Sequence, residues 1–166
     1  MIDLTYRFLR EDDFEDLHAL ASIWPVVRQL GSWPWPPSKA FTQSRCRPYR
    51  GEGFIWAMCD TDRLIGTLGV TGGIVGYNLH PDYHGQGIMT GAVADAIEQA
   101  FMTTKRDVLT ASTWHDNAAS AWVLAKQGFV HWQTRYTHAR ARGVPTLIHD
   151  HRLSRNTWQR LRSTDD

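Results

Sequence analysis

The sequence predicts an α+β fold, in which a mostly antiparallel sheet contains one parallel pair of strands and is flanked by helices. Turn residues separate three short apolar segments over 53–79, which indicates an antiparallel meander. An amphipathic helix follows, with apolar side chains at helical spacing over 89–101, and after it an apolar strand over 108–114. A helix of this length between two strands implies a parallel crossover, which is right-handed by default.

The N-terminal part of the chain predicts a strand and then a helix. Residues 4–9 alternate imperfectly between apolar and polar side chains and predict the strand. Apolar side chains at helical spacing predict a helix over 14–23, with Asp12 or Asp13 as its N-cap. We expect Pro25 to interrupt this helix.

A stiff aromatic loop is predicted over 32–37, because its prolines exclude regular helix and central strand. It separates a short helix expected over 26–30 from another expected over 39–47. The loop holds Trp33 and Trp35. Two indoles fixed by prolines can wall a pocket or pack onto neighbouring helices, and the sequence leaves both alternatives open.

The rest of the chain completes a mixed sheet. Asn117 is expected to cap a helix that ends at Gly128. The remaining expected elements are the meander strands (53–59, 64–71 and 74–79), that helix (118–126), an antiparallel pair (129–138 and 145–153) and a short C-terminal helix.

The composition is that of a soluble globular protein, and 166 residues fit one domain over 1–166. The formal net charge is +1, and the mildly basic stretch 152–162 indicates a solvated face more than an RNA contact. Cys46 and Cys59 form no disulfide framework, so a reduced, cytoplasmic chain is expected. No signal-peptide pattern and no apolar run long enough for a membrane span is present in the sequence.

A glycine-rich turn precedes the long helix. Gly85 and Gly87 flank Gln86 where the chain has to bend closely. The helix start that follows offers free N–H groups and the positive end of a dipole, which suit an anion such as a pyrophosphate. The spacing is not that of a nucleoside-triphosphate P-loop. It also misses the third glycine of the dinucleotide fingerprint, which disfavours a nicotinamide or flavin enzyme.

Two segments of the chain resemble one known superfamily. Residues 77–90 (YNLHPDYHGQGIMT) resemble the acetyl-CoA motif of the GNAT N-acetyltransferases, and 117–129 (NAASAWVLAKQGF) resemble their second conserved helix. The N-terminal pattern of strand, acid-rich turn, helix and Trp/Pro loop is similar to the ribosomal-protein-alanine N-acetyltransferase branch. The resemblance implies the GNAT fold, with the parallel strand pair at the CoA-binding splay.

The resemblance implies that acetyl-CoA is the co-substrate. In the superfamily pattern the phosphate loop opens with Arg or Gln, where this chain has His84, and its sixth position is small, where this chain has Met89. A neutral imidazole attracts phosphate less than a guanidinium does, so a modest and pH-dependent CoA affinity is expected. The residues that the resemblance places at CoA are Leu79, His84, Gly85, Gln86, Gly87, Ile88, Met89, Thr90, Asn117 and Ser120.

The resemblance also implies two catalytic groups. The backbone N–H of Leu79 would face the thioester carbonyl as an oxyanion donor. Ser120 is the candidate to stabilise or protonate the leaving thiolate, and Asn117 would contact the pantetheine arm. An N-cap and a first-turn polar residue explain Asn117 and Ser120 equally well without any ligand. The tyrosine that many branches carry four residues after this serine is Leu124 here.

The acceptor side is less well marked. The side chains hypothesised to shape it are Trp33, Trp35, Tyr77 and Asn78. A base would serve an amine acceptor, and the candidates, none placed by a motif, are His131, His138, His149 and Asp150. A metal at 149–151 is not expected, because strand alternation sends the central carboxylate to the face opposite the two histidines.

These observations together predict an N-acetyltransferase that moves acetyl from acetyl-CoA to a primary amine by direct attack. The sequence does not choose between a protein N-terminal α-amine and a small-molecule amine as the acceptor, and the modest charge argues slightly against a polyamine. The alternative is a non-catalytic acyl-CoA-binding regulatory module that keeps the loop without turnover. No membrane or nucleic-acid partner is expected, and a homodimer is left open.

Overall fold

The computed structural model describes residues 2–163 and contains one mixed sheet of seven strands. The strand order is β1-β2-β3-β4-β5-β7-β6, and the pairs are antiparallel except for β4 with β5. The strands are β1 (Leu4–Phe8), β2 (Gly53–Asp60), β3 (Arg63–Thr71), β4 (Ile74–Leu79), β5 (Val108–Trp114), β6 (Val130–Ala139) and β7 (Val144–Ser154). The predicted fold class, with its meander and its single parallel pair, is confirmed.

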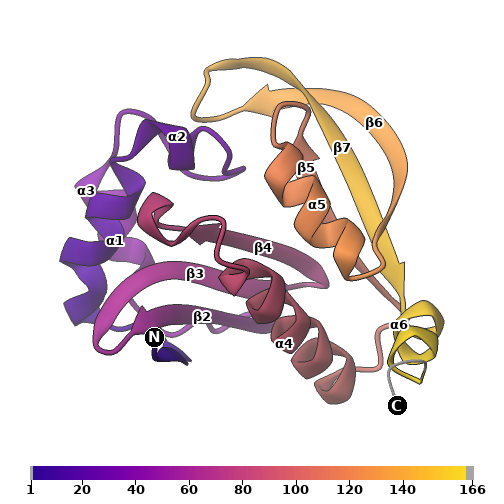
Figure 1. Cartoon of the computed structure of the whole chain (residues 1–166). Coiled ribbons are helices and arrows are strands. Elements are labelled where there is room, and N and C mark those ends of the chain that lie inside the picture. Colours follow the sequence, from indigo (N-terminus) through magenta and orange to yellow (C-terminus); the bar gives the residue numbers. More distant parts are fainter. Residues whose placement is uncertain (1, 164–166) are drawn as a thin grey trace.

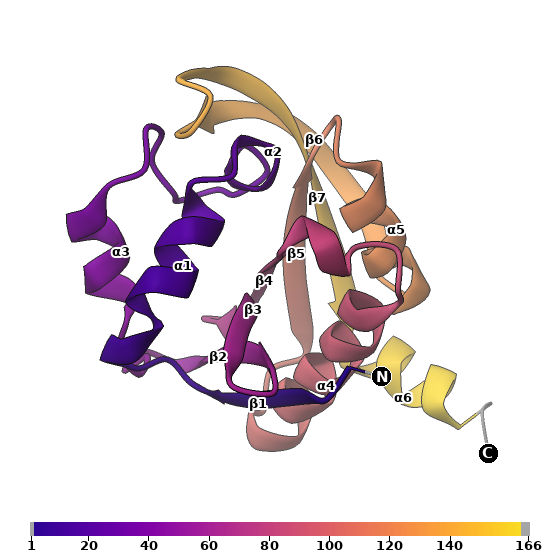
Figure 2. The ribbon, with the colours of Figure 1, turned by 60° about the vertical axis from the view of Figure 1, so that its left-hand side comes forward.

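Helices cover both faces of the sheet. The helices α1, α2 and α3 lie on one side, and α4, α5 and α6 lie on the other (Figures 1 and 2). Their bounds are α1 (Phe14–Ala21), α2 (Trp24–Val27), α3 (Lys39–Arg45), α4 (Ile88–Thr103), α5 (Ala118–Lys126) and α6 (Arg155–Arg162), with 3₁₀ turns η1 (Glu11–Asp13) and η2 (Pro81–Tyr83).

The N-terminal helices differ from the predicted ones in two details. The first helix ends at Ala21, before Pro25 as expected, but the next helix begins at Trp24, so Pro25 lies in its first turn, where a proline needs no N–H partner. Asp13 precedes α1 but its side chain does not cap the helix. Its carboxylate instead accepts hydrogen bonds from the Arg7 guanidinium at 2.6 and 2.9 Å and from the Arg10 N–H at 2.8 Å.

Two apolar clusters hold the layers together. The smaller one joins α1 to β2 through Leu17, Leu20 and Ala57. The larger one joins the sheet to α4, and it confirms the apolar face predicted for this helix. The α4 residues buried in it are Ala92, Val93, Ala96, Ile97, Ala100 and Phe101. Burial of this face fixes the direction in which the N-terminus of α4 points.

The parallel pair is short. The only paired residues of β4 and β5 within the described chain are Ile74 and Thr110, and the Thr110 N–H donates to the Gly73 oxygen at 2.9 Å. Beyond this point β4 remains paired with β3 as far as Leu79, while β5 pairs with β7 as far as Trp114. The two strands therefore diverge in the middle of the sheet, which confirms the predicted splay.

Among the described helices, none is both long enough and apolar enough to cross a membrane.

Candidate active site

The loop between η2 and α4 depends on two left-handed glycines. Gly85 has φ +72° and Gly87 has φ +76°, a region that side chains with a Cβ rarely adopt. A Cβ built at either position would have no heavy atom within 4 Å, apart from the neighbouring residues. The two glycines are therefore required by the backbone turn, and the space beside them is open.

The start of α4 presents unpaired N–H groups to this loop. The Gly91 N–H closes the first helical hydrogen bond, to the Gly87 oxygen at 3.2 Å. The N–H groups of Ile88, Met89 and Thr90 precede this bond, so they have no partner inside the helix. Unpaired N–H groups and the positive end of the dipole suit a phosphate, so the chemistry of this loop fits the pyrophosphate of CoA.

His84 braces the loop against the end of β4. Its Nε2 lies 2.9 Å from the Leu79 carbonyl oxygen, and since a carbonyl only accepts, this nitrogen carries the proton. The Gln86 side chain adds a second tie, because its Nε2 donates to the Asp82 oxygen at 2.9 Å. The histidine at the loop entrance is exposed, but its ring is tied to the end of β4 by this hydrogen bond.

Asn78 anchors the end of β4 to β3. The Thr67 N–H donates to Asn78 Oδ1 at 3.0 Å, and Asn78 Nδ2 donates to the Thr67 hydroxyl at 2.8 Å. The side chain is buried. Both polar atoms of this amide are therefore engaged within the sheet.

The backbone of Leu79 points toward the side of the splay. The His80 N–H donates to the Ile65 oxygen of β3 at 2.7 Å. Because successive residues of a strand point their N–H groups to opposite edges, the Leu79 N–H faces the edge away from β3. The Leu79 carbonyl faces the same edge, which agrees with its contact to His84. This geometry makes the Leu79 N–H available as a donor where β5 has diverged.

Tyr77 and Ser120 meet across the splay. The Tyr77 hydroxyl, from β4, lies 2.7 Å from the Ser120 Oγ in the first turn of α5. Burial raises the pKa of Tyr77 to about 12, against a smaller lowering by the Ser120 hydrogen bond. The phenol therefore stays protonated around neutral pH. The sequence placed Tyr77 and Ser120 in separate roles, and their contact could be found only from the fold.

Asn117 and Gln127 position the helix that carries Ser120. The Asn117 Oδ1 accepts the Ser120 N–H at 3.2 Å, so the predicted N-cap is confirmed. At the other end of α5, Gln127 Nε2 donates to the Thr90 oxygen at 3.1 Å, which ties α5 to the first turn of α4. The two predicted motifs thus form one side-by-side unit.

The two loop tryptophans differ in their environment. Trp33 packs against the smaller apolar cluster and meets Phe41 edge-on, with ring centroids 5.2 Å apart. Trp35 remains 39% exposed and lies against Trp24, with centroids 5.1 Å apart. Of the two alternatives for this loop, packing describes Trp33, whereas Trp35 presents part of its ring to solvent.

The candidate bases are not equivalent. Asp150 is buried, which opposes its ionisation, but hydrogen bonds from Arg135, Ser112 and Gln133 outweigh burial and lower its pKa. This carboxylate is charged and fully engaged, so it is a poor base. His138 is exposed.

His131 and His149 share one hydroxyl as a hydrogen-bond partner. Nε2 of His131 and Nδ1 of His149 each lie 2.8 Å from the Thr134 Oγ1. Their neighbour His151 is buried, and burial together with the charges of His131 and His149 lowers its pKa. Within residues 2–163, no group of three or more His, Cys, Asp or Glu side chains is arranged to hold a metal ion.

The sequence did not predict an arginine cluster beside Asn117, in which Arg28 and Arg142 both bind Asp116. Arg142, at the tip of the β6–β7 hairpin, forms a bidentate ion pair with Asp116 at 2.7 and 2.9 Å. Arg28, just after α2, binds the same carboxylate at 2.5 Å, and its backbone oxygen accepts from Arg142 Nε at 3.0 Å. The hairpin tip is thereby held over α2 (Figure 1).

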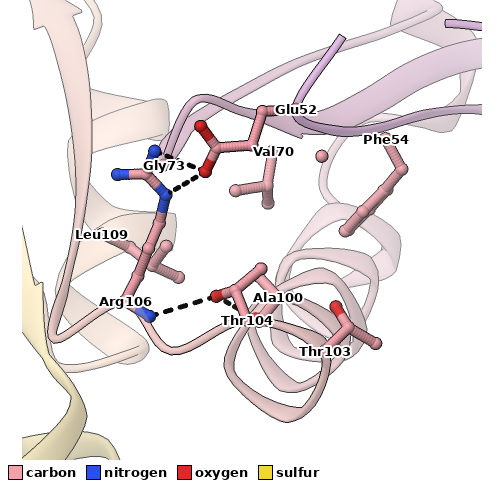
Figure 3. A pocket seen from close by; sticks show the side chains of 10 residues that line it. Glu52, Phe54, Val70, Gly73, Ala100, Thr103, Thr104, Arg106 and Leu109 are labelled. Atoms are coloured by element: carbon pink, nitrogen blue, oxygen red, sulfur yellow. Dashed lines mark hydrogen bonds and ion pairs between the residues drawn. The ribbon is translucent and has the colours of Figure 1, made fainter. Parts of the chain in front are cut away.

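A small cavity lies at the other end of α4 (Figure 3). Ala100, Thr103 and Thr104 line it from the helix, and the Arg106–Glu52 ion pair closes one side. Its volume of about 20 Å³ is room for roughly one water. The cavity is too small for a substrate and lies away from the Gly85–Thr90 loop.

Comparisons with known proteins identify one matching family. The sequence profile described as "Acetyltransferase (GNAT) domain" matches residues 3–130. No curated protein matches the chain in sequence.

Solved structures share the fold at low identity. Spermidine N-acetyltransferase from Vibrio cholerae, in complex with CoA and spermine, superposes with a TM-score of 0.78 at 14% identity, over 94% of this chain and 98% of that one. Ribosomal-protein-S5-alanine acetyltransferase from Vibrio fischeri has a TM-score of 0.72 at 22% identity, over 95% and 96%. AAC(6')-Ib in complex with ribostamycin and coenzyme A has a TM-score of 0.74 at 18% identity, over 96% and 97%.

Proposed function

Because the chain belongs to the acetyltransferase (GNAT) domain family, we propose that it moves the acetyl group of acetyl-CoA to a primary amine by direct attack. The new N–C bond forms as the C–S bond breaks, and the proton that leaves nitrogen balances the one that sulfur gains. The observation that carries the proposal is the glycine loop at the start of α4, beside the point where β4 and β5 diverge. When bound, acetyl-CoA supplies an acetyl group activated as a thioester.

The residues of the site take different parts in this proposal. The N–H groups from Gly85 to Thr90 hold the pyrophosphate, and His84 keeps the loop in place. The Leu79 N–H stabilises negative charge on the thioester oxygen. Ser120 donates to the sulfur, and Asn117 lies beside the pantetheine arm.

The cysteines support direct attack without an enzyme-bound acetyl group. Cys46 and Cys59 are both buried in the smaller apolar cluster. Burial raises the pKa of each thiol, so neither forms a thiolate readily at neutral pH. Neither side chain belongs to the network around Ser120.

For the acceptor, we favour an α-amine over a polyamine. An α-amino group has a pKa of about 8 and loses its proton more easily than a lysine, at about 10.4. In the arginine cluster, two guanidiniums share the single carboxylate of Asp116, directly before Asn117. An excess of positive charge at this place repels a polycation. The related structures named above act on or bind amines of several kinds, which agrees with a primary amine as the general class.

Thiol release from acetyl-CoA, measured with a panel of amines, tests the proposal. The panel contains peptides with a free N-terminus, the same peptides with a blocked N-terminus and an internal lysine, spermidine, and an aminoglycoside. We expect amine-dependent release that is fastest with the free N-termini. Tight CoA binding without amine-dependent release across the panel would overturn the enzyme and support the non-catalytic acyl-CoA-binding module.

A further inference from the structure

A pair of hydroxyls links the strand that carries the oxyanion donor to the helix beside it. Tyr77 lies two residues before Leu79 on β4, and its hydroxyl is 2.7 Å from Ser120 Oγ. The Ser120 carbonyl oxygen is 3.3 Å from the same hydroxyl and makes the weaker contact. The ring of Tyr77 packs against the larger apolar cluster, so its hydroxyl is held at one place.

Either hydroxyl of this pair can donate the hydrogen bond to the other. A serine hydroxyl has one hydrogen and rotates to suit its surroundings. If the phenol donates to Ser120 Oγ, the serine hydrogen is free to donate to a third atom. The Ser120 backbone is fixed as well, because its N–H donates to Asn117 Oδ1 at 3.2 Å. The backbone of Ser120 is therefore fixed, and the Tyr77 hydroxyl holds the position of its Oγ.

Ser120 is the only side chain of α5 that carries a hydroxyl. The residues around Ser120 on the helix are apolar, and Leu124, one turn further on, is buried in the larger cluster. Lys126 lies at the last turn, over the ring of Trp122. The hydroxyl that lies against Ser120 Oγ comes from the sheet, on Tyr77.

We infer that Tyr77 is a positioning residue that acts through Ser120, donating to its Oγ so that the serine hydrogen points to the CoA sulfur. The inference rests on the proposed function, since it concerns how the leaving sulfur is stabilised. A chain of two hydroxyl donors strengthens the terminal one, because each hydrogen bond polarises the next. Tyr77 itself does not touch the reacting atoms.

Three variants test this inference in acetyl transfer. Tyr77→Phe removes one oxygen and keeps the ring, Ser120→Ala removes the terminal donor, and the double variant removes both. For Tyr77→Phe we expect kcat to fall about 5- to 10-fold, the effect of one lost hydrogen bond, with the KM for acetyl-CoA unchanged. The double variant should be no slower than Ser120→Ala, because Tyr77 acts only through the serine.

A binding measurement separates this inference from the proposed function. The affinity of CoA is compared with that of the analogue in which hydrogen replaces the thiol, by calorimetry. We expect the wild-type chain to prefer CoA, and Tyr77→Phe to reduce this preference about 5-fold while the analogue binds as before. This readout holds even if no amine in the panel is acetylated.

Tyr6→Phe is the matched control. Tyr6 lies on β1, and its hydroxyl donates to the Asp95 carboxylate at 2.8 Å and makes no contact with Ser120. Loss of this hydroxyl should leave kcat and the CoA preference unchanged. Additive losses in Tyr77→Phe and Ser120→Ala would show that Tyr77 acts independently and overturn the inference. A raised KM with unchanged kcat, or an equal loss of CoA and analogue affinity, would overturn it too, since Tyr77 would then only pack against the ligand.

Discussion

Arg142 and Asp116 form a bidentate ion pair that joins the tip of the β6–β7 hairpin to the loop before α5. The Arg142 side chain is only 11% exposed, and it also donates to the Gln29 side chain at 3.0 Å and lies over the ring of Trp114. One guanidinium therefore connects the hairpin, the α2 region and the start of α5, next to the Asn117 cap. The packing of these three parts, which are distant in sequence, therefore depends on Arg142.

Replacement of Arg142 by alanine is expected to destabilise the fold. The change leaves Asp116 with Arg28 alone and removes several hydrogen bonds, which should lower the free energy of unfolding by about 1–3 kcal/mol. Urea unfolding of the variant and the wild type measures this difference in free energy. Arg140→Ala is the control on the same hairpin, because its exposed guanidinium makes one hydrogen bond to the Ser32 oxygen and stacks on Phe41. An equal loss in both variants would contradict a special role of Arg142.

The same ion pair predicts a pH dependence of stability. The Arg142 hydrogen bonds lower the pKa of Asp116 from 3.8 to about 2, against the opposing effect of burial. Its stabilisation is therefore fully present above the ordinary pKa and is lost as the pH falls from about 4 toward 2. Discounted for partial exposure, it amounts to about 1 kcal/mol. Asp116→Asn should lower stability at neutral pH and flatten the acid limb of unfolding curves. If the acid limb of Asp116→Asn were as steep as that of the wild type, Asp116 would not be the group whose protonation destabilises the fold.

Gly87→Glu should abolish CoA binding. The position has φ +76° in open space beside the helix start, so a side chain there strains the backbone and places a carboxylate where the pyrophosphate is proposed to bind. Calorimetric titration with CoA measures the loss. Gly143→Glu is matched in strain and charge, because Gly143 has φ +71° and open space in the β6–β7 turn, and it should bind CoA normally. Unchanged affinity in Gly87→Glu would refute the placement of the pyrophosphate.

His84→Arg should tighten CoA binding. A guanidinium at the loop entrance can still reach the Leu79 oxygen and adds a permanent charge near the phosphates, so we expect Kd to fall about 3- to 10-fold at low salt. The gain should shrink at high salt, because exposed charges are screened. His138→Arg adds the same charge on β6 and should change little. A weaker or salt-independent affinity in His84→Arg would mean that the residue only braces the backbone.

The local sequence pattern was sufficient to predict the helices and strands of the sheet and the glycine-rich loop before α4. Apolar spacing predicted α4 and its buried face, and the turn residues predicted the meander, because both depend on neighbours a few residues apart. The GNAT resemblance, which rested on 77–90 and 117–129, is confirmed by the family profile over 3–130. The short N-terminal helices were predicted less well, since Pro25 fits either the start or the end of a helix.

The local sequence pattern could not predict which side chains the site residues contact. The sequence by itself determined the mixed sheet, the left-handed glycines before a helix start, and the Asn117 cap, because each follows from the conformations that particular residues allow. Only the tertiary structure decided that Tyr77 meets Ser120, that His84 holds the Leu79 oxygen, and that Asp116 is shared by two arginines. These contacts join strands, helices and loops that the packing of the sheet brings together, and side-chain direction across such distances is set by the fold as a whole.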